Sequence, residues 1–124
     1  MQRIALIGLA GLAGTLGRYW LSLTVARRYG EDFPAGTLVV NVVGCFLAGA
    51  LFHLLQERFE VGETARSAVL VGLLGGFTTF SAYGLQTFAL LRDGQLLLAA
   101  LNVVGSNLLG LLMVWAGYSL ARLV

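Results

Sequence analysis

The sequence predicts an all-α membrane protein in which four helices cross the bilayer and the third is broken. Its 124 residues are 58% hydrophobic and only 11% charged, which is far too apolar for a soluble domain of ordinary composition. Four apolar stretches each approach the ~20 residues that a helix needs to cross about 30 Å of hydrocarbon. We therefore expect one domain, residues 1–124, with spans at about residues 4–26, 35–55, 65–91 and 95–120.

The first span follows a short start that resembles the charged region of a signal peptide. We expect it to be retained, because it is long, carries Arg18 and precedes three further spans. Glycines recur in it every third residue, a spacing that lets helices approach closely within one subunit or between two. These glycines are Gly8, Gly11, Gly14 and Gly17.

The second and fourth spans each carry a pair of polar residues on one helix face. Thr37 and Asn41 are four residues apart, as are Asn102 and Ser106. Polar groups at membrane depth need a partner or water, so each pair either lines a polar track or hydrogen-bonds neighbouring helices. Cys45 is the single cysteine, which rules out a disulfide within the chain.

The third span contains the segment that we expect to break the helix. Gly75 and Gly76 precede the β-branched pair Thr78 and Thr79, and both features weaken a helix. Non-helical backbone at membrane depth is tolerated only where protein or a water-filled cavity surrounds it. We therefore predict an interruption over Gly75–Ser81 and a functional centre around it.

The chemistry available inside the spans favours an anion over a proton. No Asp, Glu or Lys lies deep in a span, and His53 falls near the end of the second. Proton-coupled transport usually needs an intramembrane carboxylate. The hydroxyls, the amides, the Arg18 guanidinium and the ring edges of Phe80 and Tyr83 can all replace the water around a small anion.

Backbone carbonyl oxygens at the break carry a partial negative charge, so they would attract a cation and not an anion. An unwound turn at Gly75 to Thr78 would leave C=O groups without helical donors, and hard cations bind such oxygens. If two copies of the turn met across a symmetry axis, they would cage one ion of the size of Na⁺ as a structural bridge.

The charges give the chain little preference for one membrane orientation. Four arginines fall on the side of the N-terminus (3, 58, 66 and 122) and three on the other (27, 28 and 92). A bias of one residue orients a protein weakly, so either the counts are simply small or the chain inserts both ways and forms an antiparallel dimer. Four helices enclose no lumen, so a pore needs a partner. The dispersed arginines argue against a nucleic-acid surface.

The chain resembles the Fluc/CrcB fluoride-channel family of small bacterial membrane proteins over essentially its whole length. The most specific motifs are FPAGTLVVNVVG at residues 33–44 and GGFTTFS at residues 75–81, in the right order. Weaker matches lie at Gly17–Tyr19 and Ser106–Gly110.

The resemblance implies a dual-topology antiparallel homodimer in the bacterial inner membrane, with two fluoride pathways and a central Na⁺ that is not transported. No enzymatic chemistry is implied. The Na⁺ would bind the backbone carbonyls of Gly75 and Thr78, and Arg18 would attract anions into a vestibule. The predicted pore set is Thr37, Asn41, Phe80, Ser81, Tyr83, Asn102 and Ser106.

Three positions depart from the family pattern. Tyr83 stands where phenylalanine is usual, Ala82 where threonine is common, and Asn102 where a pore tyrosine is expected. Tyr83 keeps the ring edge and adds a hydroxyl, Ala82 removes a polar group, and Asn102 replaces a phenol with an amide. These departures leave the conduction rate and the number of fluoride positions open.

Two other functions are compatible with a small four-span protein. A small multidrug-type proton-coupled exporter is also often dual-topology, but it needs the intramembrane carboxylate that this chain lacks. A membrane assembly subunit without transport activity would use its polar residues and glycines only to hold helices together.

Overall fold

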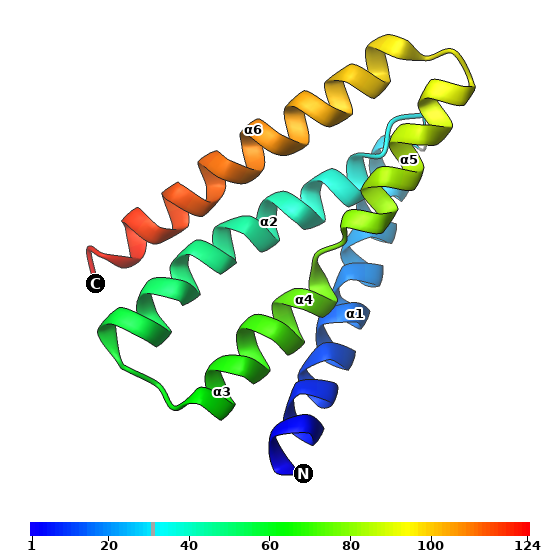
Figure 1. Ribbon diagram of the computed structural model, residues 1–124. Coiled ribbons are helices and arrows are strands. Elements are labelled where there is room, and N and C mark those ends of the chain that lie inside the picture. Colours follow the sequence, from blue (N-terminus) through cyan, green and yellow to red (C-terminus); the bar gives the residue numbers. More distant parts are fainter. Residues whose placement is uncertain (31) are drawn as a thin grey trace.

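The structure of the chain, a computed structural model, describes residues 1–30 and 32–124. Within these residues, four helical segments are long and apolar enough to cross a membrane, as the sequence predicts (Figure 1). Each segment begins and ends within one helical turn of its expected boundary. The four segments are Gln2–Tyr29, Ala35–Arg58, Glu63–Arg92 and Leu96–Ala121.

The first span is a single helix, α1 (Gln2–Tyr29). Arg27 and Arg28 lie in its last turn, where positive charge interacts favourably with the helix dipole. The helix ends at Gly30, whose φ of 84° is in the left-handed region that glycine adopts readily. α1 packs against the first half of the third span and against the second span.

The second and fourth spans form the most extensive helix pair. The second comprises α2 (Ala35–Phe52) and a π-helical continuation, η1 (His53–Arg58), and the fourth is α6 (Leu96–Ala121). A Cβ added to Gly49 would overlap the Val114 carbonyl, and one added to Gly117 would overlap the Phe46 carbonyl. The backbones of α2 and α6 therefore touch directly, as small residues allow.

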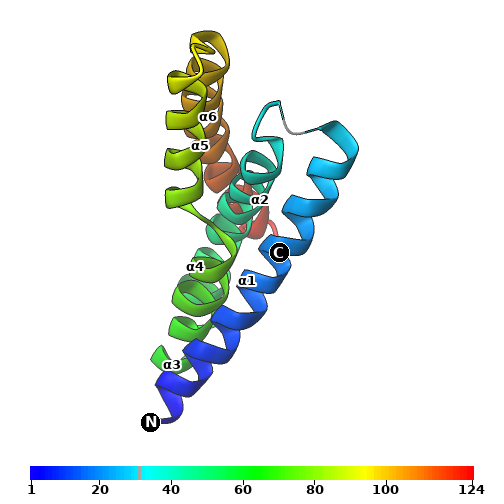
Figure 2. The same ribbon diagram turned by 90° about the vertical axis from the view of Figure 1, so that its right-hand side faces the viewer.

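The third span is built from several short helices. It runs through α3 (Glu63–Ser67), η2 (Ala68–Leu73) and α4 (Leu74–Phe77), and resumes as α5 (Phe80–Arg92). Between α4 and α5 the ribbon changes direction (Figures 1 and 2). The second half of the span is therefore displaced from the first half.

The non-helical stretch is shorter than the range Gly75–Ser81 expected from the sequence. Only Thr78 and Thr79 are extended, with φ/ψ of −84°/158° and −150°/117°. The two glycines stay in α4 because glycine weakens a helix by only about 1 kcal/mol. Ser81 is already in α5, because the Thr79 side chain caps that helix by accepting from the Ala82 N–H at 3.2 Å.

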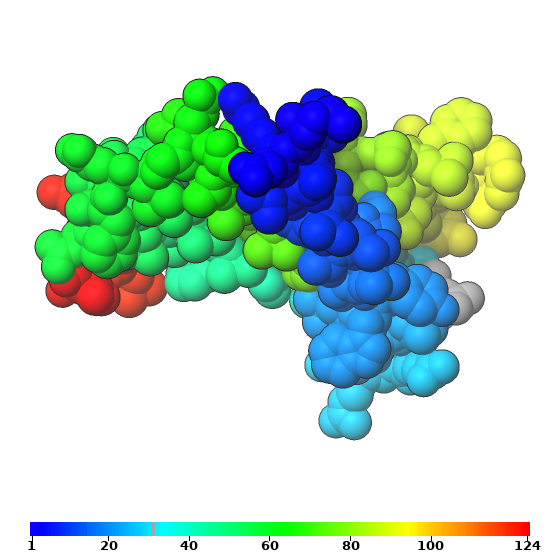
Figure 3. Space-filling model, turned by 90° about the horizontal axis from the view of Figure 1, so that it is seen from below, coloured from blue at the N-terminus to red at the C-terminus, as the bar shows by residue number. Residues whose placement is uncertain are grey.

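The helices run between two ends of an elongated molecule. Both termini and the connection from η1 to α3 lie toward one end, and the other two connections lie toward the opposite end (Figure 1). From below, the second half of α1 projects from the side of the molecule (Figure 3). Few side chains are buried, and many large apolar side chains along all four spans are exposed, as expected where lipid or a second subunit covers a helix.

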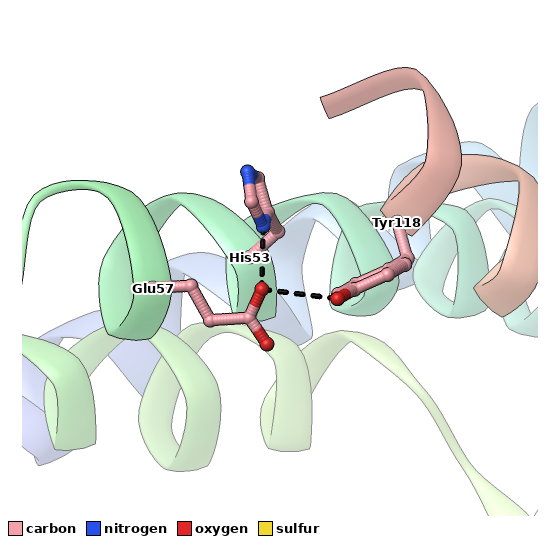
Figure 4. A network of polar contacts seen from close by, with 3 residues as sticks. All are labelled: His53, Glu57 and Tyr118. Atoms are coloured by element: carbon pink, nitrogen blue, oxygen red, sulfur yellow. Dashed lines mark hydrogen bonds and ion pairs between the residues drawn. The ribbon is translucent and has the colours of Figure 1, made fainter. Parts of the chain in front are cut away.

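A polar network joins the ends of the second and fourth spans (Figure 4). The Glu57 Oε2 atom accepts from the Tyr118 hydroxyl at 3.0 Å and lies 2.7 Å from the His53 Nδ1 atom. The His53 and Tyr118 rings meet edge to face, with their centroids 5.4 Å apart. The network fixes η1 against α6 at the end of the molecule that carries the termini.

Candidate functional site

One side chain of α2 stabilises the non-helical backbone that interrupts the third span. The Asn41 Oδ1 atom accepts from the Thr79 backbone N–H at 2.8 Å, and the Asn41 Nδ2 atom donates to the Thr79 carbonyl at 3.0 Å. One amide thus satisfies both polar groups of an extended residue that has left the helix. We call this pair of hydrogen bonds the Asn41 clamp.

The Asn41 clamp and the Thr79 cap redirect two backbone donors. In a continuous helix, the Thr79 N–H would bond the Gly75 carbonyl, and the Ala82 N–H would bond the Thr78 carbonyl. Here the first donates to Asn41 and the second to the Thr79 hydroxyl. The Gly75 and Thr78 carbonyls therefore lose those helical donors, and their oxygens have the chemistry that a hard cation such as Na⁺ requires.

A groove of about 520 Å³ opens beside the interruption. We call it the break groove. It brings together six of the residues predicted from the sequence, contributed by α2, α4, α5 and α6 and by the extended Thr78. These residues are Asn41, Gly75, Thr78, Phe80, Tyr83 and Ser106.

Aromatic rings form an exposed edge of the break groove. The Phe80 side chain is 83% exposed. Its ring centroid lies 5.5 Å from that of Tyr83, with the two planes tilted by 45°. Aromatic edges carry the positive part of the ring quadrupole, so this wall of the groove can attract an anion.

A second groove, of about 450 Å³, lies between α1, α2 and α5. Arg18 and Thr37 line it, so the structure places these two predicted residues apart from the break groove. Thr79 lines both grooves, so the two meet at the interruption. The Gln86 Oε1 atom is also buried beside this second groove and has no hydrogen-bond partner among the described residues.

Two predicted pore residues line neither groove. Asn102 is 2% exposed, and its Nδ2 atom donates to the Thr87 hydroxyl at 2.8 Å, which ties α6 to α5. Its Oδ1 atom lies 3.5 Å from the Ser106 hydroxyl. Ser81 is exposed, with its hydroxyl 3.4 Å from that of Thr79. Within one subunit Asn102 thus acts as an interhelical hydrogen-bonding group, and the pore roles of both residues stay predictions.

The sequence reasoning missed three polar residues around the site: Thr87, Asn107 and Gln86, whose Oε1 atom is buried. Asn107 lines the break groove beside Ser106, and its Nδ2 atom lies 3.4 Å from the Tyr83 hydroxyl. Each of the three is a polar residue within an apolar span, which is the property that could have drawn attention to it.

Residues 5–118 match the family described as "CrcB-like protein, Camphor Resistance (CrcB)". The chain belongs to the CrcB family. This match confirms the resemblance drawn from the two motifs, and it includes every residue of the break groove.

Relatives of this CrcB-family chain carry the name "Fluoride-specific ion channel FluC". The one from Nitrosococcus oceani is 44% identical over 123 residues, which are 99% of this chain and 98% of the relative. The one from Opitutus terrae is 54% identical over 114 residues, or 90% and 86% of the two chains. The one from Methylococcus capsulatus is 50% identical over 116 residues, but this chain covers only 51% of that protein's length.

Proposed function

We propose that the protein is a fluoride channel that conducts the ion passively across the membrane. The observation that carries the proposal is the break groove, where amide, hydroxyl and aromatic-edge groups meet at an interruption in a membrane span. Its described lining contains no Asp or Glu. The relatives named as fluoride-specific channels support the same function.

Conduction requires the channel to replace the water around fluoride. Asn41 uses one hydrogen of its NH₂ group in the clamp and keeps the second for an anion. The Ser106 hydroxyl and the edges of Phe80 and Tyr83 supply further positive groups along the break groove. Chloride is larger and meets the same donors at poorer geometry, which gives selectivity without any covalent chemistry.

The second groove would act as the vestibule, the entrance in which anions collect before they reach the break groove. Arg18 lines this second groove together with Thr37, and Thr79 lies between it and the break groove. A guanidinium at a partly apolar entrance raises the local concentration of anions. Thr37, which is 7% exposed, adds a hydroxyl-bearing residue to the lining of the same groove.

A second copy of the chain completes each pathway in this proposal. The break groove is open on one side, and the Phe80 ring at its edge is 83% exposed. An antiparallel homodimer would close two such grooves, one for each subunit. The nearly balanced arginines, four against three, are compatible with insertion in both orientations.

A central Na⁺ would hold the two subunits together through the carbonyls of Gly75 and Thr78. These oxygens fit the ion because they have lost their helical donors. Gly75 has open space around it, since a Cβ there would meet nothing within 4 Å. The bound cation would supply the positive charge that offsets repulsion between two opposed sets of carbonyl dipoles.

In a bacterium, the channel would sit in the inner membrane and let fluoride leave the cytoplasm. Neutral hydrogen fluoride crosses membranes and dissociates inside, where the anion accumulates by weak-acid trapping. Passive flow down the electrochemical gradient then lowers the internal concentration and reduces fluoride toxicity.

The proposal is tested by ion efflux from liposomes that contain the purified protein. Potassium fluoride or potassium chloride is loaded, valinomycin provides the K⁺ shunt, and an ion-selective electrode follows the released anion. We expect fast fluoride release and negligible chloride release. Dimeric protein in Na⁺ that releases neither anion would refute the channel and favour the assembly subunit. Equal release of both anions would refute fluoride selectivity.

A further inference from the structure

We propose that the Tyr83 hydroxyl is an additional anion-binding donor in the break groove and that Asn107 positions it. This inference rests on the proposed function and deepens it, because it gives this chain a group that a phenylalanine at the same position would lack. It uses the phenol O–H, whereas the role expected from the family resemblance uses only the ring edge.

The orientation of the Asn107 amide is fixed by its own helix. One end of the amide lies 2.7 Å from the Val103 carbonyl oxygen, one turn back in α6. A carbonyl oxygen only accepts hydrogen bonds, so this end must be the NH₂ group and not the amide oxygen. The Nδ2 atom therefore lies on the side of the Val103 carbonyl.

The same NH₂ group faces the Tyr83 hydroxyl. The distance between Asn107 Nδ2 and the Tyr83 oxygen is 3.4 Å. Since an NH₂ group only donates, the phenol oxygen accepts in this contact and its own hydrogen points elsewhere. Among the described residues, no acceptor takes that hydrogen.

The phenol lies at the wall of the break groove between two side chains. Its ring packs against Phe80 with a centroid distance of 5.5 Å, and its oxygen lies 3.4 Å from Asn107 Nδ2. Both Tyr83 and Asn107 line the groove, together with Asn41 and Ser106. The O–H of Tyr83 thus lies in the same groove as the other proposed anion donors.

A phenol O–H suits a small anion for two reasons. Hydrogen bonds to an ionised acceptor are shorter and about twice as strong as neutral ones. The Asn107 contact also occupies an oxygen lone pair and not the hydroxyl hydrogen, so that hydrogen stays available to an anion in the groove. We therefore expect Tyr83 to bind fluoride more tightly than a bare ring edge does.

The test measures fluoride flux through reconstituted protein as a function of fluoride concentration. Tyr83→Phe removes only the hydroxyl and should raise the half-saturating fluoride concentration about tenfold to a hundredfold, the range for one hydrogen bond to a charged group. Tyr29→Phe is the matched control, because Tyr29 is an exposed tyrosine at the end of α1, away from both grooves. It should leave the half-saturating concentration unchanged.

The positioning role of Asn107 is tested by a double-mutant cycle with Tyr83→Phe. Asn107→Leu should raise the half-saturating concentration when Tyr83 is present and have no further effect in Tyr83→Phe, because it acts through the hydroxyl. If Asn107→Leu does not reconstitute as a folded protein, Asn107→Ala replaces it in the cycle.

Two results would overturn the inference. The first is an unchanged half-saturating concentration in Tyr83→Phe; if that protein also loses dimer stability, the O–H belongs to the contact with the partner subunit. The second is an equal effect of Asn107→Leu with and without the hydroxyl. Absent fluoride flux in the wild-type protein would instead refute the proposed function itself, and this inference with it.

Discussion

At the scale of single residues, Asn41 both stabilises the extended backbone of the interruption and supplies an N–H group to the break groove. Its amide satisfies the N–H and the C=O of Thr79, which lies 38 residues away in sequence. The same contacts take away the donor of the Gly75 carbonyl. One side chain thus sets the backbone path, leaves the Gly75 carbonyl oxygen without its helical donor and keeps one N–H for the groove.

Replacing Asn41 with alanine should damage both stability and flux. Asn41→Ala leaves two backbone groups of Thr79 without partners, and an unsatisfied buried group costs about 1–3 kcal/mol. We expect the free energy of unfolding in detergent to fall by about 2–6 kcal/mol, the sum for the two groups, and fluoride flux to be nearly abolished. Denaturant titration and liposome efflux measure the two effects.

Thr24→Ala provides the control for Asn41→Ala. The Thr24 hydroxyl also bonds a backbone carbonyl, that of Trp20 at 2.8 Å, but it is exposed and lies outside both grooves. It should change neither quantity. Wild-type flux in Asn41→Ala would show that the amide lies outside the fluoride path.

At the scale of the helices, the sequence predicted the spans well and the interruption less well. The spans follow from composition and length, which depend only on local residues. The limits of the interruption depend on a partner in another helix and on a cap: Asn41 captures the Thr79 N–H, and the Thr79 hydroxyl starts α5 at once. A local pattern of glycine and threonine contains neither fact, so the predicted range was too long.

The site residues likewise divide into those that local sequence identifies and those whose position depends on contacts with other helices. Asn41 and Phe80 could be chosen from sequence because polar and aromatic residues beside a helix break are unusual in a membrane span. Asn102 fits the same rule, yet the fold buries it against Thr87, because α6 packs beside α5 at that level. Which polar residues face the groove is decided by helix packing, which sequence spacing alone does not define.

The close contact between α2 and α6 holds together two of the helices that line the break groove. The stability of the protein should therefore be sensitive to the size of the side chains at this contact. Gly49→Ala would place a methyl group on the Val114 carbonyl, and overpacking of this kind costs about 1–3 kcal/mol. We expect the free energy of unfolding in detergent to fall by that amount, with a smaller yield of folded protein.

Gly8→Ala is the matched control for Gly49→Ala. It is also a helical glycine, but an added Cβ there would meet nothing within 4 Å. It should be neutral or slightly stabilising, because alanine favours helix over glycine by about 1 kcal/mol. Equal stability of the two variants would contradict direct backbone contact between α2 and α6.

At the scale of the whole molecule, a single subunit supplies only part of the proposed channel. The break groove is open, and the spans expose many large apolar side chains, including Phe80 and Phe88. A second subunit would close the groove and cover part of this surface. In the proposed dimer, the antiparallel arrangement and the central cation would be linked, since the cation requires the two interruptions to meet at one axis.

Removing Na⁺ should accordingly weaken the dimer as well as the channel. In protein purified and reconstituted with N-methylglucamine in place of Na⁺, the opposed Gly75 and Thr78 carbonyls would repel each other unscreened. We expect the initial rate of fluoride efflux to fall about tenfold, equivalent to ~1.4 kcal/mol, with a matching loss of dimer in cross-linking assays. Return of Na⁺ should restore both, which separates a reversible loss from denaturation. Full activity and an intact dimer after exhaustive Na⁺ removal would eliminate the cation from the assembly.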